Sequence, residues 1–516
     1  MKRYLYFTVF ASGMTTLAAE LSASRLLGNV FGTSNLVWAA IIGLILIYLT
    51  LGYSLGGRWA DRSPSPKTMY SILAWGAFSI GVVPYIATPV LRVAANAFDG
   101  LQVGILAGAF VAVLVLFSVP ITLLGMISPF AIRLSMNVAS EAGKVSGSIY
   151  AVSTLGSFVG TYLPVLVFIP IIGTSKTFLV FSLFLLFVAL VGLGLSSGRK
   201  VMLPYLIMVV VLAFLGIIAG NSSIKNTEGQ VFEAESAYNY IQVLEKDGYT
   251  YLRLNEGQGV HSIYKSGELN YGGPWQQFLA GPFFYEDTYP EDVRRMAIIG
   301  LAAGTTARQA SAVFPNVVID GYELDPRIVQ VGIEYFDMIL KNLNIHIEDG
   351  RWGLTTSPYM YEIIAVDAYR PPYIPWHMTT KEFFQVVIEH LSAKGVLVIN
   401  VGRAPNDRRL IDGLASTIGS VFPSVYIMDI PGTFNSMIYA TRQPTQKGNL
   451  NTNMVRLAIS QGVDPLLVTS IYETWGNLQP TPINSIIFTD DLAPIEWITN
   501  NMVLNYVLFG DVENIQ

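Results

Sequence analysis

A run of small residues in the second half of the chain is suited to hold a ligand. The stretch RMAIIGLAAGTTARQA (295 to 310) is a short apolar run that ends in Gly300, Ala302 and Gly304. Small residues in such a turn let the backbone approach a ligand closely. Glu323 follows about 20 residues later, at the spacing where a carboxylate accepts hydrogen bonds from both ribose hydroxyls. The pattern therefore indicates a nucleoside site.

Two further carboxylates stand at comparable places. Asp349 precedes Gly350 in a loop, and Asp367 ends the apolar run IIAVD. Each could hold or activate a ligand. The competing interpretation is ordinary helix-capping acids and turn glycines, which fits any one of these residues better than it fits the ordered set.

The elements that must position these residues are buried strands. Four near-continuous apolar runs are separated by helical or loop sequence: MAIIG (296 to 300), VVIDGYE (317 to 323), IIAVDA (363 to 368) and GVLVIN (395 to 400). Such runs are typical of a parallel, doubly wound sheet with helices on both faces. Ligands bind at the carboxyl ends of the strands in these sheets. The candidate residues are therefore expected to meet at one edge.

A smaller sheet is expected before this region. Residues 231 to 264 alternate apolar and polar side chains, and the alternation is broken at Asp247-Gly248 and at Glu256-Gly257. Period-two alternation with such turns predicts antiparallel strands joined by tight hairpins.

The first 220 residues have a different composition. They hold 12 of the 31 Lys and Arg residues but only 4 of the 36 Asp and Glu residues, so the remainder is acidic. Apolar runs of about 20 residues, long enough to cross a bilayer, lie at 4 to 28, 36 to 57, 69 to 90, 102 to 124, 146 to 170, 176 to 196 and 201 to 219. We expect seven transmembrane helices in a multi-pass protein of the cell (inner) membrane, with the lipid bilayer as partner. Gly52, Gly56 and Gly57 have the spacing of close helix packing.

The side of the membrane is left open by the sequence. Lys and Arg gather in alternate loops, which marks the cytoplasmic face, and an odd number of helices then places the second half outside the cytoplasm. An adenosyl cosubstrate would require the cytoplasmic side. The chain has no cysteine, and its four histidines form no close pair, so we expect no metal site. No segment resembles a nucleic-acid surface.

The motifs of the second half resemble those of spermidine synthases, and the whole chain is similar to membrane-fused spermidine-synthase-like proteins of bacteria. The matching stretches are ESAYNYIQV (235 to 243), LNEGQGVHS (254 to 262), IIGLAAGTTAR (298 to 308), GYELDP (321 to 326), EDG (348 to 350), VDAYRPPYIPWHMTTKEFF (366 to 384) and TDDLAPIEW (489 to 497).

This resemblance implies a small β domain followed by a Rossmann-like domain, in a homodimer or larger assembly. It implies decarboxylated S-adenosylmethionine as cosubstrate and transfer of an aminopropyl group to an amine, without a metal. By position, Glu323 would hold the ribose, Asp349 the adenine, and Asp367 would be the catalytic carboxylate. Domain bounds follow: 1–220 helical bundle, 221–274 small β domain, 275–445 Rossmann-like domain, and 446–516 carboxyl-terminal helical extension.

Departures from the family concern the amine-binding groups. Ala303 replaces the aspartate that grips the aminopropyl amine, and Arg370 replaces a second aspartate three residues after Asp367. An amide of the family becomes Asn239, and a tyrosine-containing motif becomes Trp275-Gln276-Gln277, in which Gln276 still fits the donor-binding pattern. Tyr369, Arg370 and Trp376 belong to a proline-rich substrate loop that covers the pocket in the family.

Three functions remain open from the sequence. The first is a membrane-integral transferase that uses decarboxylated S-adenosylmethionine, or S-adenosylmethionine for methyl transfer, with an amine or another small acceptor. The second is an inactive binding or sensing domain coupled to a transporter-like bundle. The third is a transporter whose second half regulates flux.

Overall fold

The structure is a computed structural model that describes residues 2–31, 35–99, 104–136, 142–219, 227–255, 259–368, 374–403, 407–482, 486–499 and 501–502. The chain divides into two compact units. The helical unit comprises Met1–Thr227 and Glu233–Tyr240, and the α/β unit comprises Glu228–Phe232 and Ile241–Gln516. The segment Glu233–Tyr240 therefore belongs with the helices although it lies within the strand region of the sequence.

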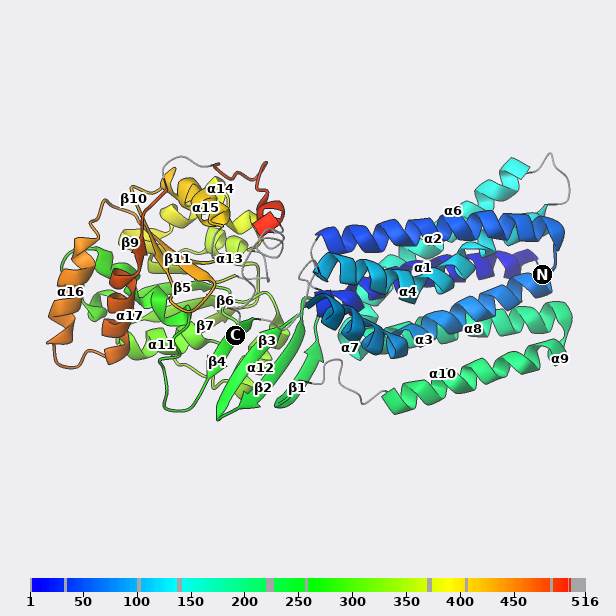
Figure 1. The fold of residues 1–516 in the computed structure, drawn as a ribbon, viewed down its shortest axis with the longest axis horizontal. Helices are drawn as coiled ribbons and strands as arrows, with labels where there is room; N and C mark the ends of the chain where they lie inside the picture. Colours follow the sequence, from blue (N-terminus) through cyan, green and yellow to red (C-terminus); the bar gives the residue numbers. More distant parts are fainter. Residues whose placement is uncertain are drawn as a thin grey trace. The chain divides into compact units, whose positions relative to one another are not determined.

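The helical unit is built from long helices interrupted by short ones (Figure 1). In chain order these are α1 (Lys2–Phe31), α2 (Asn35–Arg62), α3 (Pro66–Asp99), α4 (Gly104–Gly125), α5 (Ile127–Ser135), α6 (Ala142–Leu163), the π-helical turn η2 (Pro164–Phe168), α7 (Ile169–Ile172), α8 (Thr174–Ser197), α9 (Arg199–Met202), the 3₁₀ turn η3 (Leu203–Tyr205) and α10 (Leu206–Ala219).

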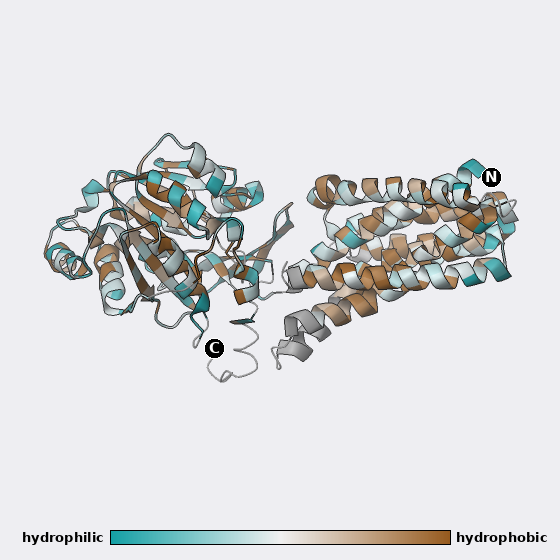
Figure 2. Cartoon of the chain, turned by 90° about the horizontal axis from the view of Figure 1, so that it is seen from above, coloured by the Kyte–Doolittle hydropathy of each residue, from teal (hydrophilic) through white to brown (hydrophobic). Residues whose placement is uncertain are grey.

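Six helical segments of the described chain are long and apolar enough to cross a membrane: Val37–Arg62, Pro66–Ala87, Gly108–Ser135, Ala142–Ile172, Thr174–Ser197 and Arg199–Ile217. Figure 2 shows the apolar colouring of these helices. The sequence predicts seven crossings. The remaining one, residues 4 to 28, forms the continuous helix α1 but is not among these six segments. Because α1 is largely enclosed by other helices, it can carry buried polar side chains such as Thr8, Thr15 and Ser22.

Two of three glycines on α2 allow close helix packing, as the sequence predicts. A Cβ atom on Gly52 would overlap the carbonyl oxygen of Thr122, and one on Gly56 would lie 2.6 Å from Cα of Met126, where α4 gives way to α5. The prediction is wrong for Gly57, because a Cβ atom there would meet nothing within 4 Å.

Polar contacts fix the segment Glu233–Tyr240 on the helices. The carboxylate of Glu235 accepts hydrogen bonds from the backbone N–H of Thr174 (2.6 Å) and from its hydroxyl (2.7 Å), at the amino terminus of α8. A carboxylate is favourable there because it satisfies helix N–H groups and complements the helix dipole. Arg25 of α1 donates to the carbonyl oxygens of Ser236 and Ala237.

The small sheet has the predicted antiparallel meander. Its strand order is β1 (Gln230–Glu235), β2 (Tyr240–Lys246), β3 (Tyr249–Leu254) and β4 (Val260–Tyr264). Asp247 and Gly248 form the two-residue turn between β2 and β3 with φ values of 54° and 79°. Positive φ at both positions is what a tight hairpin turn requires. The second predicted turn, at Glu256-Gly257, lies outside the described residues.

The large sheet has eight strands in the order β12-β10-β11-β9-β8-β5-β6-β7. Strands β5, β6, β8 and β9 are parallel, as predicted. A fifth parallel strand, β7, was not predicted, and β11, β10 and β12 extend the sheet in antiparallel fashion. Their bounds are β5 (Arg295–Ile299), β6 (Val318–Tyr322), β7 (Leu343–His346), β8 (Tyr361–Val366), β9 (Leu391–Gly402), β10 (Ser424–Asp429), β11 (Asn435–Thr441) and β12 (Leu478–Gln479).

Helices cover both faces of this sheet, which explains why its strands are apolar on both sides. Met296 and Ile298 of β5 belong to one core, while Ala297 and Ile299 belong to another. The first core is closed by η4 (Trp275–Phe284), α11 (Thr305–Val313), α12 (Pro326–Tyr335), α16 (Gly448–Ala458) and α17 (Pro465–Gly476). The second is closed by α13 (Gly350–Thr356), α14 (Lys381–Glu389) and α15 (Arg409–Gly419). The short turns η5 (Pro290–Asp292) and η6 (Trp376–Met378) complete the unit.

The glycine contacts on α2 predict a difference between two adjacent substitutions. Gly56→Ala should lower the free energy of unfolding of the purified chain by about 1–3 kcal/mol, because the new methyl group overpacks the contact with Met126. Gly57→Ala should be neutral or stabilising by up to about 1 kcal/mol, because alanine favours helix. Thermal unfolding in detergent, followed by circular dichroism, measures both. Equal losses in the two variants would contradict this packing.

Candidate active site

The predicted site residues of the α/β unit meet at one edge of the large sheet. Adjacent parallel strands place Gly300 after β5, Glu323 after β6 and Asp367 after β8, all at their carboxyl ends. Backbone contacts join these ends: the N–H of Asp367 donates to the carbonyl of Ile299 at 2.8 Å, and that of Glu323 donates to His346 at 3.0 Å. A Cβ atom on Gly300 would lie 2.5 Å from the carbonyl oxygen of Asp367, so only glycine allows this approach.

The backbone N–H groups of the glycine loop are all used within the chain. Those of Gly300 and Leu301 donate to the carbonyl of Tyr322, that of Ala302 to Glu323 Oε2, that of Ala303 to Ser262 Oγ, and that of Gly304 to Leu301, each at 3.0 Å. Loops that cradle phosphates instead direct such groups at the ligand. This loop is therefore suited to a ligand without phosphate at this position.

Glu323 connects the loop to the end of β6. Its Oε2 accepts from the N–H of Ala302 and its Oε1 from the N–H of Asp325, both at 3.0 Å. Burial raises the pKa of Glu323 to about 7, although these two backbone hydrogen bonds oppose the rise. The side chain remains partly accessible. A nearby cation or hydroxyl donors from a ligand would therefore favour its ionised form.

Ala303, which stands where the related family has an aspartate, is enclosed by apolar side chains. It is fully buried in a cluster with Ile241 and Val243 of β2, Leu252 of β3, and Phe336. An isolated carboxylate in such surroundings would be costly. Ala303 thus lies among apolar side chains, which suit alanine and would disfavour a carboxylate.

The buried side chain of Arg308 holds the glycine loop in place. Its Nη1 donates to the carbonyl oxygens of Ala303 (3.0 Å) and Phe336 (2.6 Å), and its Nη2 donates to that of Ile263 (3.0 Å). Thr305 also contacts Ile263, donating to its carbonyl at 2.9 Å. The buried guanidinium therefore ties the glycine loop, the end of α12 and strand β4 together.

Asp349 caps α13 and contacts the loop that precedes α14. Its Oδ1 accepts from the N–H of Trp352 at 3.0 Å, and its Oδ2 lies 3.1 Å from Nε2 of His377. The hydrogen bond with His377 holds the pKa of Asp349 below its usual value. Trp376, next to His377, exposes 49% of its surface, so the described part of the loop offers an aromatic side chain to a ligand.

An ion pair fastens the same loop to the carboxyl-terminal region. Arg351 of α13 donates to both oxygens of Asp490 (2.8 and 2.7 Å) and to the carbonyl of His377 (2.8 Å). Thr380 also donates to Asp490, at 2.6 Å. The arginine keeps the pKa of Asp490 below its usual value. Residues from three separate parts of the sequence are thereby linked around Asp349.

Asp367 is paired with an amide on the neighbouring strand. Its Oδ1 accepts from Nδ2 of Asn400, on β9, at 2.9 Å. Burial raises the pKa of Asp367 to about 6, and the hydrogen bond from Asn400 limits the rise. Oδ1 of Asn400 is buried and has no hydrogen-bond partner among the described residues. Two adjacent strand ends thus present carboxylate and amide oxygens, which accept hydrogen bonds.

The remaining predicted residues belong to other elements or lie outside the described residues. Gln276 is fully buried on η4, where its Nε2 lies 3.4 Å from Oδ1 of Asn270. Asn239 belongs to the segment held on the helical unit, where its backbone N–H donates to Ser236 Oγ at 2.8 Å. Tyr369 and Arg370 lie outside the described residues. No group of three or more His, Asp or Glu in the described chain could hold a metal ion.

Sequence reasoning missed His377, Asn400 and Arg308. His377 stands inside the substrate-loop motif, but its position beside Asp349 depends on how that loop folds. Asn400 is the one polar residue that closes the apolar run GVLVIN, and this place at a strand end is the signal that could have identified it. Arg308 lies on α11 at the end of the motif IIGLAAGTTAR, and its position in the sequence gives no sign that its side chain is buried.

The chain was compared with known proteins. No family model matches it. A probable polyamine aminopropyl transferase of Bifidobacterium longum is 30% identical over 279 residues, which cover 51% of this chain and 61% of the relative. The polyamine aminopropyltransferase of Vibrio vulnificus is 32% identical over 30% of this chain and 50% of its own length. The chain thus spans between half and two thirds of the length of these relatives. These similarities confirm that it is spermidine-synthase-like.

More distant similarities extend to another class of enzyme and to solved structures. The eEF1A lysine and N-terminal methyltransferase of Mus musculus is 26% identical over 30% of this chain and 23% of its own length. The structure of a probable spermidine synthase from Corynebacterium glutamicum has 18% identity and a TM-score of 0.39, with 51% of this chain and 99% of that chain covered.

The Arg351 contacts predict that one substitution loosens two distant segments. In Arg351→Met, amide hydrogen exchange should accelerate about fivefold in residues 376–382 and 488–491, because a partly exposed ion pair contributes about 1 kcal/mol. Arg409→Met is the matched control, because Arg409 pairs with Asp407 only two residues away. Exchange measured by mass spectrometry on the intact chain tests this. Unchanged exchange in both segments would show that the pair does not hold them.

Proposed function

We propose that the α/β unit is a transferase that binds an adenosyl sulfonium, S-adenosylmethionine or its decarboxylated form, and passes a group from it to a small acceptor. The observation that carries this proposal is the placement of Glu323. It stands at the end of the strand beside the glycine loop, bonded to the Ala302 N–H, where a carboxylate can accept both ribose hydroxyls. The similarity to polyamine aminopropyltransferases points to the same donor class.

The loop supports a nucleoside in preference to a dinucleotide. Its five N–H groups donate within the chain, so they offer no cradle for a pyrophosphate. Asp349 follows β7, the strand beside β6, and its carboxylate, hydrogen-bonded to His377, is placed to hold the adenine. Carboxylates at Glu323 and Asp367 in turn attract a sulfonium, whose positive charge would lower the pKa of both.

Asp367 and Asn400 are placed to receive the acceptor. A protonated amine must lose a proton before its nitrogen can attack the carbon bound to sulfur. That proton passes to Asp367, the nitrogen lone pair forms the new bond to carbon, and the carbon–sulfur bond breaks to leave a neutral thioether. The buried Oδ1 of Asn400 accepts a second N–H of the amine and orients it.

The raised pKa of Asp367 helps the proton transfer. An ordinary aspartate would accept a proton from an alkylammonium at a cost of about 9 kcal/mol, from pKa values of about 3.9 and 10.4. At a pKa of about 6 the cost falls to about 6 kcal/mol. Burial thus makes Asp367 a better base than a solvated aspartate, while it stays largely ionised at neutral pH.

The environment of Ala303 bears on which of two reactions, aminopropyl transfer or methyl transfer, the unit catalyses. An aminopropyl donor would find no carboxylate for its primary amine there, because Ala303 is enclosed by apolar side chains. Methyl transfer from S-adenosylmethionine is therefore a second candidate reaction. The similarity to a eukaryotic methyltransferase is in keeping with it.

A binding or sensing domain without catalysis is the alternative function. It would keep the Glu323 contacts and bind the nucleoside, but Asp367 would have no proton to accept. The apolar surroundings of Ala303 favour this alternative because they remove a group on which aminopropyl transfer relies. Turnover, rather than binding, separates the two.

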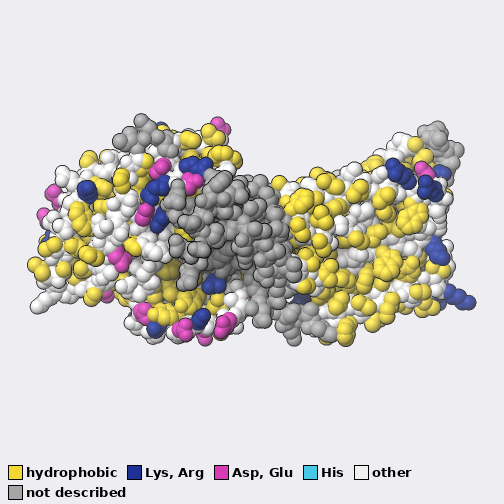
Figure 3. All heavy atoms as spheres, in the orientation of Figure 1, with side chains coloured by type: hydrophobic (Ala, Val, Ile, Leu, Met, Phe, Trp, Pro, Cys, Tyr) yellow, Lys and Arg dark blue, Asp and Glu magenta, His cyan; other side chains and the backbone are white. Residues whose placement is uncertain are grey.

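We further propose that the helical unit spans a cell membrane. Six apolar helices of sufficient length support this location. Hydrophobic side chains cover the visible face of the helical unit, and Lys and Arg gather at one of its ends (Figure 3).

Donor binding is predicted to depend on Glu323. Titration calorimetry on the full chain in detergent, with S-adenosylmethionine and separately with decarboxylated S-adenosylmethionine, should detect binding of at least one. Glu323→Gln should weaken that binding about 10-fold to 100-fold, because a hydrogen bond to a charged group contributes about 1.5–3 kcal/mol. Preference for the decarboxylated ligand supports aminopropyl transfer, and preference for the intact ligand supports methyl transfer.

Glu362→Gln is the matched control for this titration. Glu362 also accepts hydrogen bonds from backbone N–H groups, those of Arg294 and Arg295, but at the start of β5. It should leave donor affinity unchanged. Absence of binding by either donor to the folded wild-type chain would contradict the proposed function.

Turnover is predicted to rise with pH as Asp367 ionises. With the donor that binds and a diamine acceptor, kcat should increase as the pH rises to about 6 and level off above it, because only the ionised carboxylate accepts a proton and the bound sulfonium keeps the pKa of Asp367 at or below its ligand-free value. Asp367→Asn should abolish turnover and retain donor binding. Asn400→Ala should move the acidic limb to higher pH, because Asn400 lowers the pKa of Asp367. If kcat falls but the acidic limb of the pH profile stays at the same pH, Asn400 does not tune the pKa of Asp367.

A further inference from the structure

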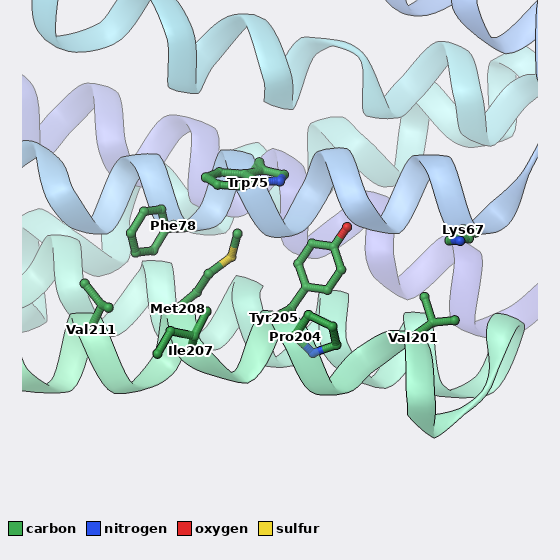
Figure 4. A pocket seen from close by; sticks show the side chains of 9 residues that line it. All are labelled: Lys67, Trp75, Phe78, Val201, Pro204, Tyr205, Ile207, Met208 and Val211. Atoms are coloured by element: carbon green, nitrogen blue, oxygen red, sulfur yellow. The ribbon is translucent and has the colours of Figure 1, made fainter.

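The helical unit carries an apolar groove of about 520 Å³ between α3 and the α9–α10 segment (Figure 4). Its walls are Trp75 and Phe78 of α3 and, across from them, side chains of the α9–α10 segment: Val201, Pro204, Tyr205, Ile207, Met208 and Val211. Trp75 and Ile207 expose 51% and 61% of their surface, so the groove is open along its length. The hydroxyl of Tyr205 donates to Ser71 Oγ at 2.8 Å and fixes the two walls at that point.

The groove has the length of one lipid chain. From Lys67 to Phe78 the α3 wall rises about 16 Å, at about 1.5 Å per residue, and the opposite wall from Val201 to Val211 rises about 15 Å. Half of the hydrocarbon core of a bilayer is about 15 Å thick. The groove is therefore about as long as a single leaflet is deep.

One end of the groove is cationic. Lys67 lines it there, beside Val201 (Figure 4), and Arg199 and Lys200 directly precede Val201 in the chain. All three side chains are exposed, and none pairs with an acid among the described residues. Asp61, the acidic residue at the end of α2, is already paired with Arg133 at 3.3 Å.

We propose that this groove binds one anionic glycerophospholipid. Its acyl chain lies along Trp75, Phe78 and Met208, and its phosphate lies at Lys67, Arg199 and Lys200. Apolar walls as deep as one leaflet fit the chain, and the three unpaired cations fit the headgroup charge, which basic pockets between transmembrane helices recognise. The inference rests on the proposed membrane location and is independent of the transferase reaction.

The test measures which lipid the full chain retains. The chain is reconstituted into liposomes of equal phosphatidylglycerol and phosphatidylethanolamine, extracted in mild detergent, and weighed by native mass spectrometry. The wild type should retain one phosphatidylglycerol. Neutralising the three cations together (Lys67→Gln, Arg199→Gln, Lys200→Gln) should lower the preference for phosphatidylglycerol about 100-fold, at about fivefold per cation. Ile207→Trp, which fills the groove, should lower retention of both lipids.

The matched controls make the same changes in charge and in side-chain volume at positions outside the groove. Arg58→Gln, Arg62→Gln and Lys144→Gln together remove three basic residues that do not line the groove, and Val210→Trp enlarges an exposed residue of α10 outside it. Both controls should behave as the wild type. Circular dichroism melting of every variant confirms that the helices are folded.

Four outcomes would overturn the inference. Equal retention in the groove variants and their controls would mean that the lipid is held elsewhere. A dimer that Ile207→Trp dissociates would mean that a second copy of the chain covers the groove. Failure of the wild-type chain to float with liposomes would refute the membrane location itself, whereas flotation without lipid selectivity would refute the lipid site alone.

Discussion

The site depends on one carboxylate that joins two strand ends. Glu323 accepts the N–H of Ala302 in the glycine loop and the N–H of Asp325 at the start of α12, so it fixes the loop after β5 against the end of β6. The four other N–H groups of the loop also donate within the chain. A loop built this way is rigid and lacks the free donors that phosphates need. Recognition must then come from the carboxylates around it, which suits a cationic nucleoside.

The strand-end arrangement could be predicted from the sequence because burial on both sheet faces makes the strands apolar. MAIIG, VVIDGYE, IIAVDA and GVLVIN all became parallel strands in this sheet. The antiparallel strands β10 to β12 were not predicted. Strands β10 and β11 form a local hairpin, but the pairing of β11 with β9 and of β12 with β10 joins distant segments. The same holds for His377 beside Asp349 and for Asn400 beside Asp367. Such pairs are set by packing, and local periodicity carries no information about them.

The segment Glu233–Tyr240, which is held on the helical unit, leads directly into strand β2. Glu235 caps α8, Arg25 binds the carbonyls of Ser236 and Ala237, and strand β2 begins three residues later at Tyr240. Ile241 and Val243 of that strand pack in the cluster that encloses Ala303. Strand β2, which follows this segment in the chain, therefore contributes to the apolar surroundings of Ala303.

The central claim is that this strand edge binds the nucleoside that both donors share, and a structure of the full chain with 5′-methylthioadenosine tests it most directly. This nucleoside carries neither donor tail, so the result does not depend on Ala303. The account predicts both ribose hydroxyls within hydrogen-bonding distance of Glu323, with the adenine beside Asp349. A nucleoside bound away from Glu323, or no bound nucleoside at saturating concentration, would contradict it.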